Sequence, residues 1–78
     1  MNPREYLAQA DWHIDMTRRQ VVRQREVVNQ LAQAGNETTE ANSMLQAMET
    51  GLHAYERHRQ RIIDRLDRIK EAEKQAGN

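Results

Sequence analysis

Apolar residues recur along this chain in alternating steps of three and four, the spacing of a helix that packs against another helix. In the first half this stripe comprises Leu7, Ala10, Ile14, Thr17, Val21, Gln24, Val28 and Leu31. In the second half it comprises Ala41, Leu45, Met48, Leu52, Tyr55, Arg59, Ile62, Leu66 and Ile69. The pattern predicts two long helices, over about residues 3–34 and 38–75, in one domain covering residues 1–78.

A short polar segment separates the two stripes. Gly35 and Asn36 tolerate a positive φ and commonly end helices, while the Thr38 hydroxyl suits the cap of a following helix. At the other end of the first stripe, Asn2 and Pro3 are typical of a helix start. We therefore expect a turn over residues 35–37 and an all-α fold, in which two antiparallel helices form a helical hairpin of the coiled-coil type.

The two stripes face each other consistently when positions whose numbers add to 76 are paired, because every pair then joins an a to a d heptad position. The hairpin core predicted in this way is Leu7, Ile14, Val21, Val28, Leu31, Leu45, Met48, Leu52, Tyr55, Ile62, Leu66 and Ile69. Two layers of this seam are polar, with Gln24 opposite Leu52 and Thr17 opposite Arg59. We interpret them as devices that fix the register, and the alternative is a polar cluster that serves a ligand.

The two edges of the seam differ. One edge brings Arg25 near Glu49 and Arg18 near Glu56, as ion pairs. The other edge is small, apolar or weakly polar, with Tyr6, His13, Gln20, Val27 and Ala34 facing Met44, Gly51, His58, Arg65 and Ala72. Two helices alone bury too little surface to offset the cost of ordering them. We therefore predict a homodimeric four-helix bundle whose contact includes the residues Val27, Met44, Gly51, His13 and His58.

Composition adds few constraints. The chain has 78 residues, with 12 basic and 12 acidic side chains and no cysteine. From Glu26 to Glu56 there are acidic residues but no Lys or Arg, so the hairpin is expected to be acidic near its turn and basic toward its ends. Without a cysteine framework, a signal-like apolar block or a membrane-length apolar run, we expect a cytoplasmic protein with no membrane partner.

Candidate chemistry is sparse. His13 and His58 fall on the same edge of the seam, but they lack a clear third metal ligand, so we interpret them as hydrogen-bonded or exposed histidines. No phosphate loop, activated nucleophile or zinc-protease motif is present, so we expect no catalytic, cofactor-binding or metal-binding residues and no enzyme.

Three functional interpretations stay open. The leading one is a scaffolding or interaction module that self-associates and has room for a further, unidentified protein partner. A second is a nucleic-acid-associated regulator that uses a belt of arginines, disfavoured by the balanced charge and scattered aromatic residues. A third is a small regulatory subunit that receives a partner helix, with Trp12 and Met16 as anchors.

Several segments of the chain, taken together, resemble a group of short uncharacterised bacterial proteins. They are His13-Ile14, Arg23 to Val28, Leu31, Gly35 to Ala41, Leu45, His58-Arg59, Ile62 and Leu66, which together span residues 13–66. The group usually has Asp where this chain has Glu37. The resemblance implies a helical hairpin of the bacterial cytoplasm and one shared polar patch formed by the residues His13, Arg23, Gln24, His58 and Arg59, and it carries no known activity.

Overall fold

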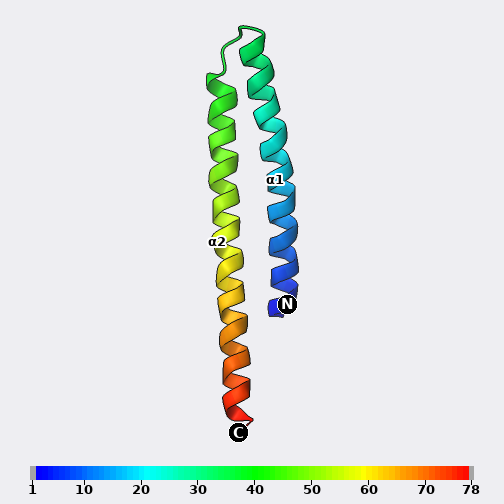
Figure 1. Cartoon of the computed structure of the whole chain (residues 1–78), viewed down its shortest axis with the longest axis vertical. Helices are drawn as coiled ribbons and strands as arrows, with labels where there is room; N and C mark the ends of the chain where they lie inside the picture. Colours follow the sequence, from blue (N-terminus) through cyan, green and yellow to red (C-terminus); the bar gives the residue numbers. More distant parts are fainter. Residues whose placement is uncertain (1, 78) are drawn as a thin grey trace.

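The computed structural model describes residues 2–77 and consists of two antiparallel α-helices that lie side by side (Figure 1). Helix α1 spans Pro3–Gln33 and helix α2 spans Thr39–Ala76. The rod measures 68 × 16 × 15 Å. The predicted all-α helical hairpin is confirmed, and each helix boundary lies within one residue of the prediction.

Helix α1 begins at a capping box. The side chain of Asn2 accepts a hydrogen bond from the Glu5 amide at 2.9 Å, and the Glu5 carboxylate accepts one from the Asn2 amide at 3.1 Å. Pro3 follows at the first helical position, where its missing amide hydrogen leaves no bond unmade. These local contacts start the helix before any residue of α2 is involved.

The turn between the helices depends on Gly35, which has φ +74°. The amides of Gly35 and Asn36 donate to the carbonyls of Ala32 and Leu31, at 3.1 and 2.9 Å, which is the Schellman arrangement. Asn36 was also expected to tolerate a positive φ, but no residue in 2–77 other than glycine adopts one. Thr38 precedes α2 as predicted, yet its hydroxyl caps no amide and instead accepts a hydrogen bond from Asn42 Nδ2 at 3.0 Å.

The register of the two helices differs from the predicted one. Four contacts cross the seam: Gln24 with Ala41, His13 with Tyr55, Asp11 with Arg59, and Arg25 with Glu49. The residue numbers of these pairs add to 65, 68, 70 and 74, so they centre near 69 rather than 76. The difference is one heptad, and a slide of one heptad again places every a opposite a d.

The turn is compatible with the observed register but does not select it. Helix α1 ends at Gln33 and α2 begins at Thr39, and these two numbers add to 72, between 69 and 76. The periodicity of the sequence therefore specifies which faces meet, while the contacts across the seam show which heptads meet.

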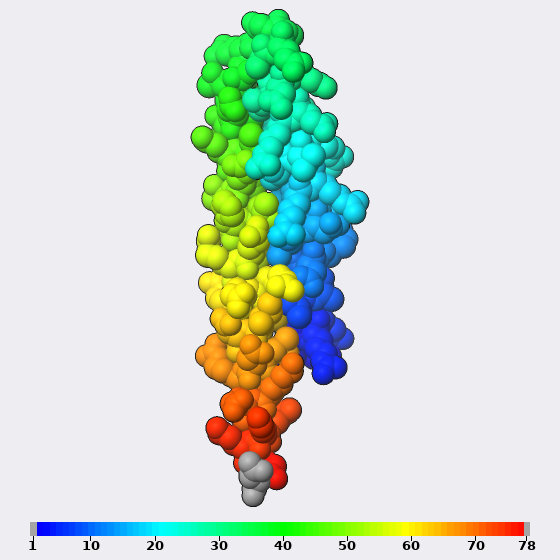
Figure 2. Space-filling model, viewed as in Figure 1, coloured from blue at the N-terminus to red at the C-terminus, as the bar shows by residue number. Residues whose placement is uncertain are grey.

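The observed register, in which facing residues have numbers that add to about 69, leaves the C-terminal end of α2 without a partner helix. Pro3, at the start of α1, lies beside Leu66, and the two residues line the same hollow. Every residue from 67 to 77 is exposed, and Figure 2 shows this end of α2 projecting beyond α1. Ile69 was predicted to belong to the core, but it is exposed because it meets only the start of α1, where it lines the same hollow as Pro3.

The core of the hairpin is thin. Among residues 2–77, only Ala10, Ile14, Val21 and Ala41 are buried. Most other predicted core residues are half-buried, namely Leu7, Val28, Leu31, Leu45, Met48, Leu52, Ile62 and Leu66. Tyr55 was predicted for the core but is exposed, because its ring leaves the seam and stacks on His13. Two helices thus cover only one side of each apolar stripe.

Candidate protein-interaction surface

The seam divides the surface of the hairpin into two flanks. The charged flank comprises Asp11, Arg18 and Arg25 of α1 and Glu49, Glu56 and Ile63 of α2. The apolar flank comprises Tyr6, His13, Gln20, Val27 and Ala34 of α1 and Met44, Gly51, His58, Arg65 and Ala72 of α2. Both sets follow from the heptad positions beside the seam.

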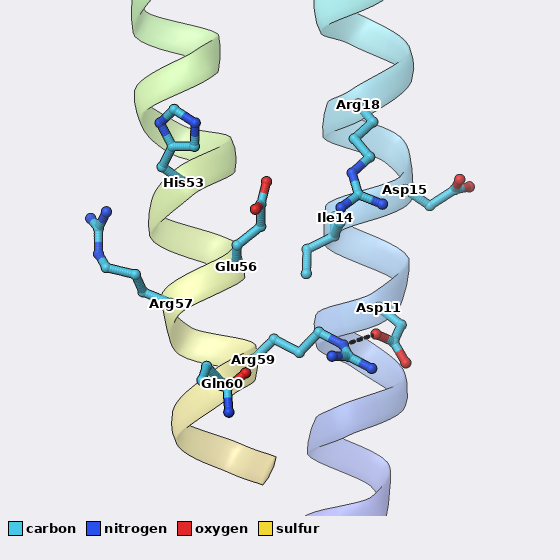
Figure 3. Close-up of a pocket in the computed structure, with 9 residues that line it drawn as sticks. All are labelled: Asp11, Ile14, Asp15, Arg18, His53, Glu56, Arg57, Arg59 and Gln60. Carbon is cyan, nitrogen blue, oxygen red and sulfur yellow. Dashed lines mark hydrogen bonds and ion pairs between the residues drawn. The ribbon is translucent and has the colours of Figure 1, made fainter. Parts of the chain in front are cut away.

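On the charged flank, ion pairs connect the two helices. Arg25 Nη2 lies 3.1 Å from Glu49 Oε1, as predicted. Arg59 reaches across the seam to Asp11, and Figure 3 shows its side chain bridging the two helices. Arg18 and Glu56 point into the same gap but do not form the expected ion pair. These contacts leave an open hollow of about 690 Å³ with mixed charge.

The predicted polar layers are arranged differently in the structure, because the register has shifted by one heptad. Gln24 does not face Leu52; its Nε2 donates to the carbonyl oxygen of Ala41 at 2.9 Å, which ties α1 to the first turn of α2. The Thr17 hydroxyl donates within its own helix to the His13 carbonyl at 2.7 Å. Arg59 binds Asp11 rather than lying opposite Thr17. Within residues 2–77 no buried side-chain N or O lacks a partner.

The apolar flank carries a short series of packed rings. The ring of His13 lies 5.2 Å from that of Tyr55 and nearly parallel to it, at 25°. The Trp12 ring meets the other side of this group edge-on, 5.2 Å from His13 and at 84°. Trp12 remains 60% exposed, so one of its faces is free to pack against another surface.

Nearer the turn, the apolar flank exposes aliphatic residues. Val27 is 41% and Met44 is 54% exposed, and the register places them level with each other. Gly51 is half-buried, and a Cβ built on it would meet no atom within 4 Å. A glycine in mid-helix costs about 1 kcal/mol relative to alanine, a cost that a close packing contact would offset. Within residues 2–77 no such contact is present.

The five residues that the resemblance assigns to one polar patch divide between two levels of the hairpin, with His13, His58 and Arg59 at one level and Arg23 and Gln24 nearer the turn. His13 stacks on Tyr55, Arg59 binds Asp11, and Gln24 binds Ala41 close to the turn. His58 is exposed on the apolar flank, and Arg23 is exposed on α1. In residues 2–77 no group of three or more His, Cys, Asp or Glu side chains is placed to hold a metal ion.

The predicted arginine belt is interrupted by acidic side chains. Arg18 of α1 lines the same hollow as Arg57 and Arg59 of α2, so the two arginine clusters adjoin at this level. Asp11, Asp15 and Glu56 line the same hollow, and Arg59 binds Asp11. The two clusters therefore form a surface of mixed charge rather than one continuous basic surface.

Comparisons with known proteins add no relative. No protein-family model matches the chain, and neither a curated protein nor a solved structure matches it. Within residues 2–77, neither helix combines the length and the apolar character needed to cross a bilayer. The hypotheses about function therefore depend on the two flanks and on the thin core between them.

Proposed function

We propose that this chain is a non-enzymatic interaction module that self-associates through its apolar flank into a four-helix bundle and acts as a small scaffold. The observation that carries the proposal is the contrast between a thin core and an apolar exterior. Only four residues of 2–77 are buried, while Tyr6, Trp12, Val27 and Met44 are each more than 40% exposed. As the resemblance implies, we place this scaffold in the bacterial cytoplasm.

The size of the apolar flank suits a dimer interface. Helix α1 contains 31 residues, so the paired part of the rod is about 46 Å long. With a rod width of 16 Å, one face offers roughly 700 Å² from each copy. Two copies together bury about 1,400 Å², within the range of about 1,200–2,000 Å² that is typical of specific interfaces.

The energetics favour the same conclusion. A hairpin of this length buries few side chains completely, whereas ordering each residue costs about 1–2 kcal/mol of backbone entropy. Covering the apolar flank with another copy removes exposed apolar area from water at about 25 cal/mol per Å². Folding and association are then coupled, so the helical content rises together with the population of dimer.

Sedimentation equilibrium over a wide range of protein concentration tests this proposal. The expected result is twice the 9.2 kDa mass of one chain, with helicity that falls on dilution. A monomer mass at every concentration, together with full helicity, contradicts it. Capture of nucleic acid from a lysate, lost after nuclease treatment, would favour the regulator with an arginine belt instead.

A further inference from the structure

We propose that the second copy packs antiparallel on the apolar flank, with its two-fold axis passing between Gln20 and Gly51, so that the acidic turn of each copy covers the basic end of the other. The inference rests on the proposed self-association and specifies its geometry. Three observations carry it: the overlap of the paired segments, the open glycine, and the distribution of charge.

The overlap of the two rods places the axis near the middle of α1. Helix α1 spans Pro3–Gln33, so its midpoint is residue 18, and Gln20 is the nearest residue of the apolar flank. In the observed register Gln20 lies level with Gly51, just as Val27 lies level with Met44. An axis at residue 20 leaves only residues 3–6 of each α1 uncovered, whereas an axis one heptad away leaves residues 24–33 or residues 3–20 uncovered, because a displaced axis shifts the partner by twice its own displacement. The central position therefore buries the most surface.

Gly51 allows the two α2 helices to approach closely at this axis. The axis relates residues of the two α2 helices whose numbers add to 102, so Gly51 meets Gly51 of the second copy. The space in front of it is empty to 4 Å in the single hairpin. On the outer side of the same contact, Ala47 meets Ala54, and both are exposed in the single hairpin. Small residues at a helix crossing let the backbones come near, which offsets the cost of glycine within a helix.

Along the rest of the interface, apolar residues near the turn meet rings near the free ends. The same axis places Met44 against His58 and Val27 against His13 of the second copy, in both directions. Met44 and Val27 are 54% and 41% exposed in the single hairpin, so both are stabilised by this burial. Trp12 lies beside His13 and adds a ring to the edge of the contact.

Charge selects the antiparallel orientation. Residues 26–47, around the turn, carry the acidic side chains Glu26, Glu37 and Glu40 and no basic one, while residues 57–65 of α2 carry four arginines and only one acidic residue. The axis brings Glu40 level with Arg61 of the second copy and Glu37 level with its Arg65. A parallel arrangement instead places acidic turns at the same level and the arginines at the same level, which is repulsive.

Two sets of variants test this geometry by sedimentation. Gly51→Ala is expected to raise the dimer dissociation constant about tenfold or more, while raising the melting temperature of the dilute monomer, because alanine favours the helix but blocks the crossing. Thr50→Ala, one residue away and exposed, is the matched control, for which a change below about twofold is expected.

The charge swap tests the orientation. Glu40→Lys and Arg61→Glu are each expected to weaken the dimer, and the double variant is expected to restore it, because the two charges meet only between copies. If the wild type is a dimer and neither Gly51→Ala nor the charge swap changes its dissociation constant, this geometry is overturned while self-association stands. A wild-type monomer at all concentrations overturns self-association itself.

Discussion

The two flanks of the hairpin border the same seam but differ in how much of their chemistry is satisfied within one chain. On the charged flank, Arg25 binds Glu49 and Arg59 binds Asp11, so long polar side chains bridge the helices and still reach water. On the apolar flank, Val27 and Met44 have no such alternative and remain exposed. The same backbone thus presents one edge whose polar groups are paired within the chain and one whose apolar residues are exposed. This contrast is the basis of the proposed self-association.

The largest effect on association is expected from a charge placed on the apolar flank. Met44→Lys is expected to weaken association about 30-fold or more, because the dimer would bury an unpaired ammonium group against the basic end of the second copy. Val22→Lys is the matched control, since Val22 is 53% exposed on the outer face of α1 and belongs to neither flank. Sedimentation of both variants measures the effect. Equal dissociation constants for the two variants would show that the apolar flank is not the interface.

Removing the ring that connects the seam to the apolar flank is expected to have a smaller effect. Tyr55→Ala eliminates the stack on His13 and lowers the free energy of unfolding by about 1–2 kcal/mol. Tyr6→Ala removes a similar ring from a site that is 47% exposed and is the control, expected to be nearly neutral in the dilute monomer. Thermal unfolding followed by circular dichroism measures both variants. A neutral Tyr55→Ala would mean that this stack contributes nothing to the hairpin.

On the charged flank, replacing a seam arginine by an apolar residue is expected to stabilise the fold. Arg59 occupies an a position level with the small, buried Ala10, and its ion pair with Asp11 is partly exposed. Arg59→Leu loses an exposed pair that contributes about 0–1 kcal/mol and gains apolar contact, for a net stabilisation of about 1 kcal/mol. Chemical denaturation measures the change. A decrease of more than about 1 kcal/mol in the free energy of unfolding would show that the ion pair between Arg59 and Asp11 holds the helices in register.

The smallest expected effect belongs to the exposed ion pair. A double-mutant cycle of Arg25→Ala and Glu49→Ala is expected to give a coupling energy of about 0–1 kcal/mol, because both side chains are partly solvated. Raising the salt concentration to about 1 M should remove most of this coupling, since it shortens the screening length to about 3 Å. Coupling that survives high salt would indicate a buried pair and would weaken the contrast between the flanks.

Several elements follow from local sequence alone. Asn2, Pro3 and Glu5 start α1 through bonds within the first turn. Gly35 ends α1 because it accepts φ +74° without a Cβ clash. The heptad stripes determine which face of each helix turns inward, and the Arg25–Glu49 pair lies within reach in both candidate registers because long side chains tolerate a shift of a few residues.

The choice of heptad required the tertiary structure. A slide of seven residues restores the same a–d pattern, so periodicity allows both registers, and the contacts across the seam identify the one that the chain adopts. Ile69 is consequently exposed, because it meets only the start of α1. The ring of Tyr55 leaves the seam for His13, a side-chain choice that the heptad pattern does not contain. The sequence by itself determined two helices, their facing stripes, the two flanks and the turn, because these depend on near neighbours. The structure decided the register and the side-chain contacts across the seam, because these depend on how two rigid helices meet.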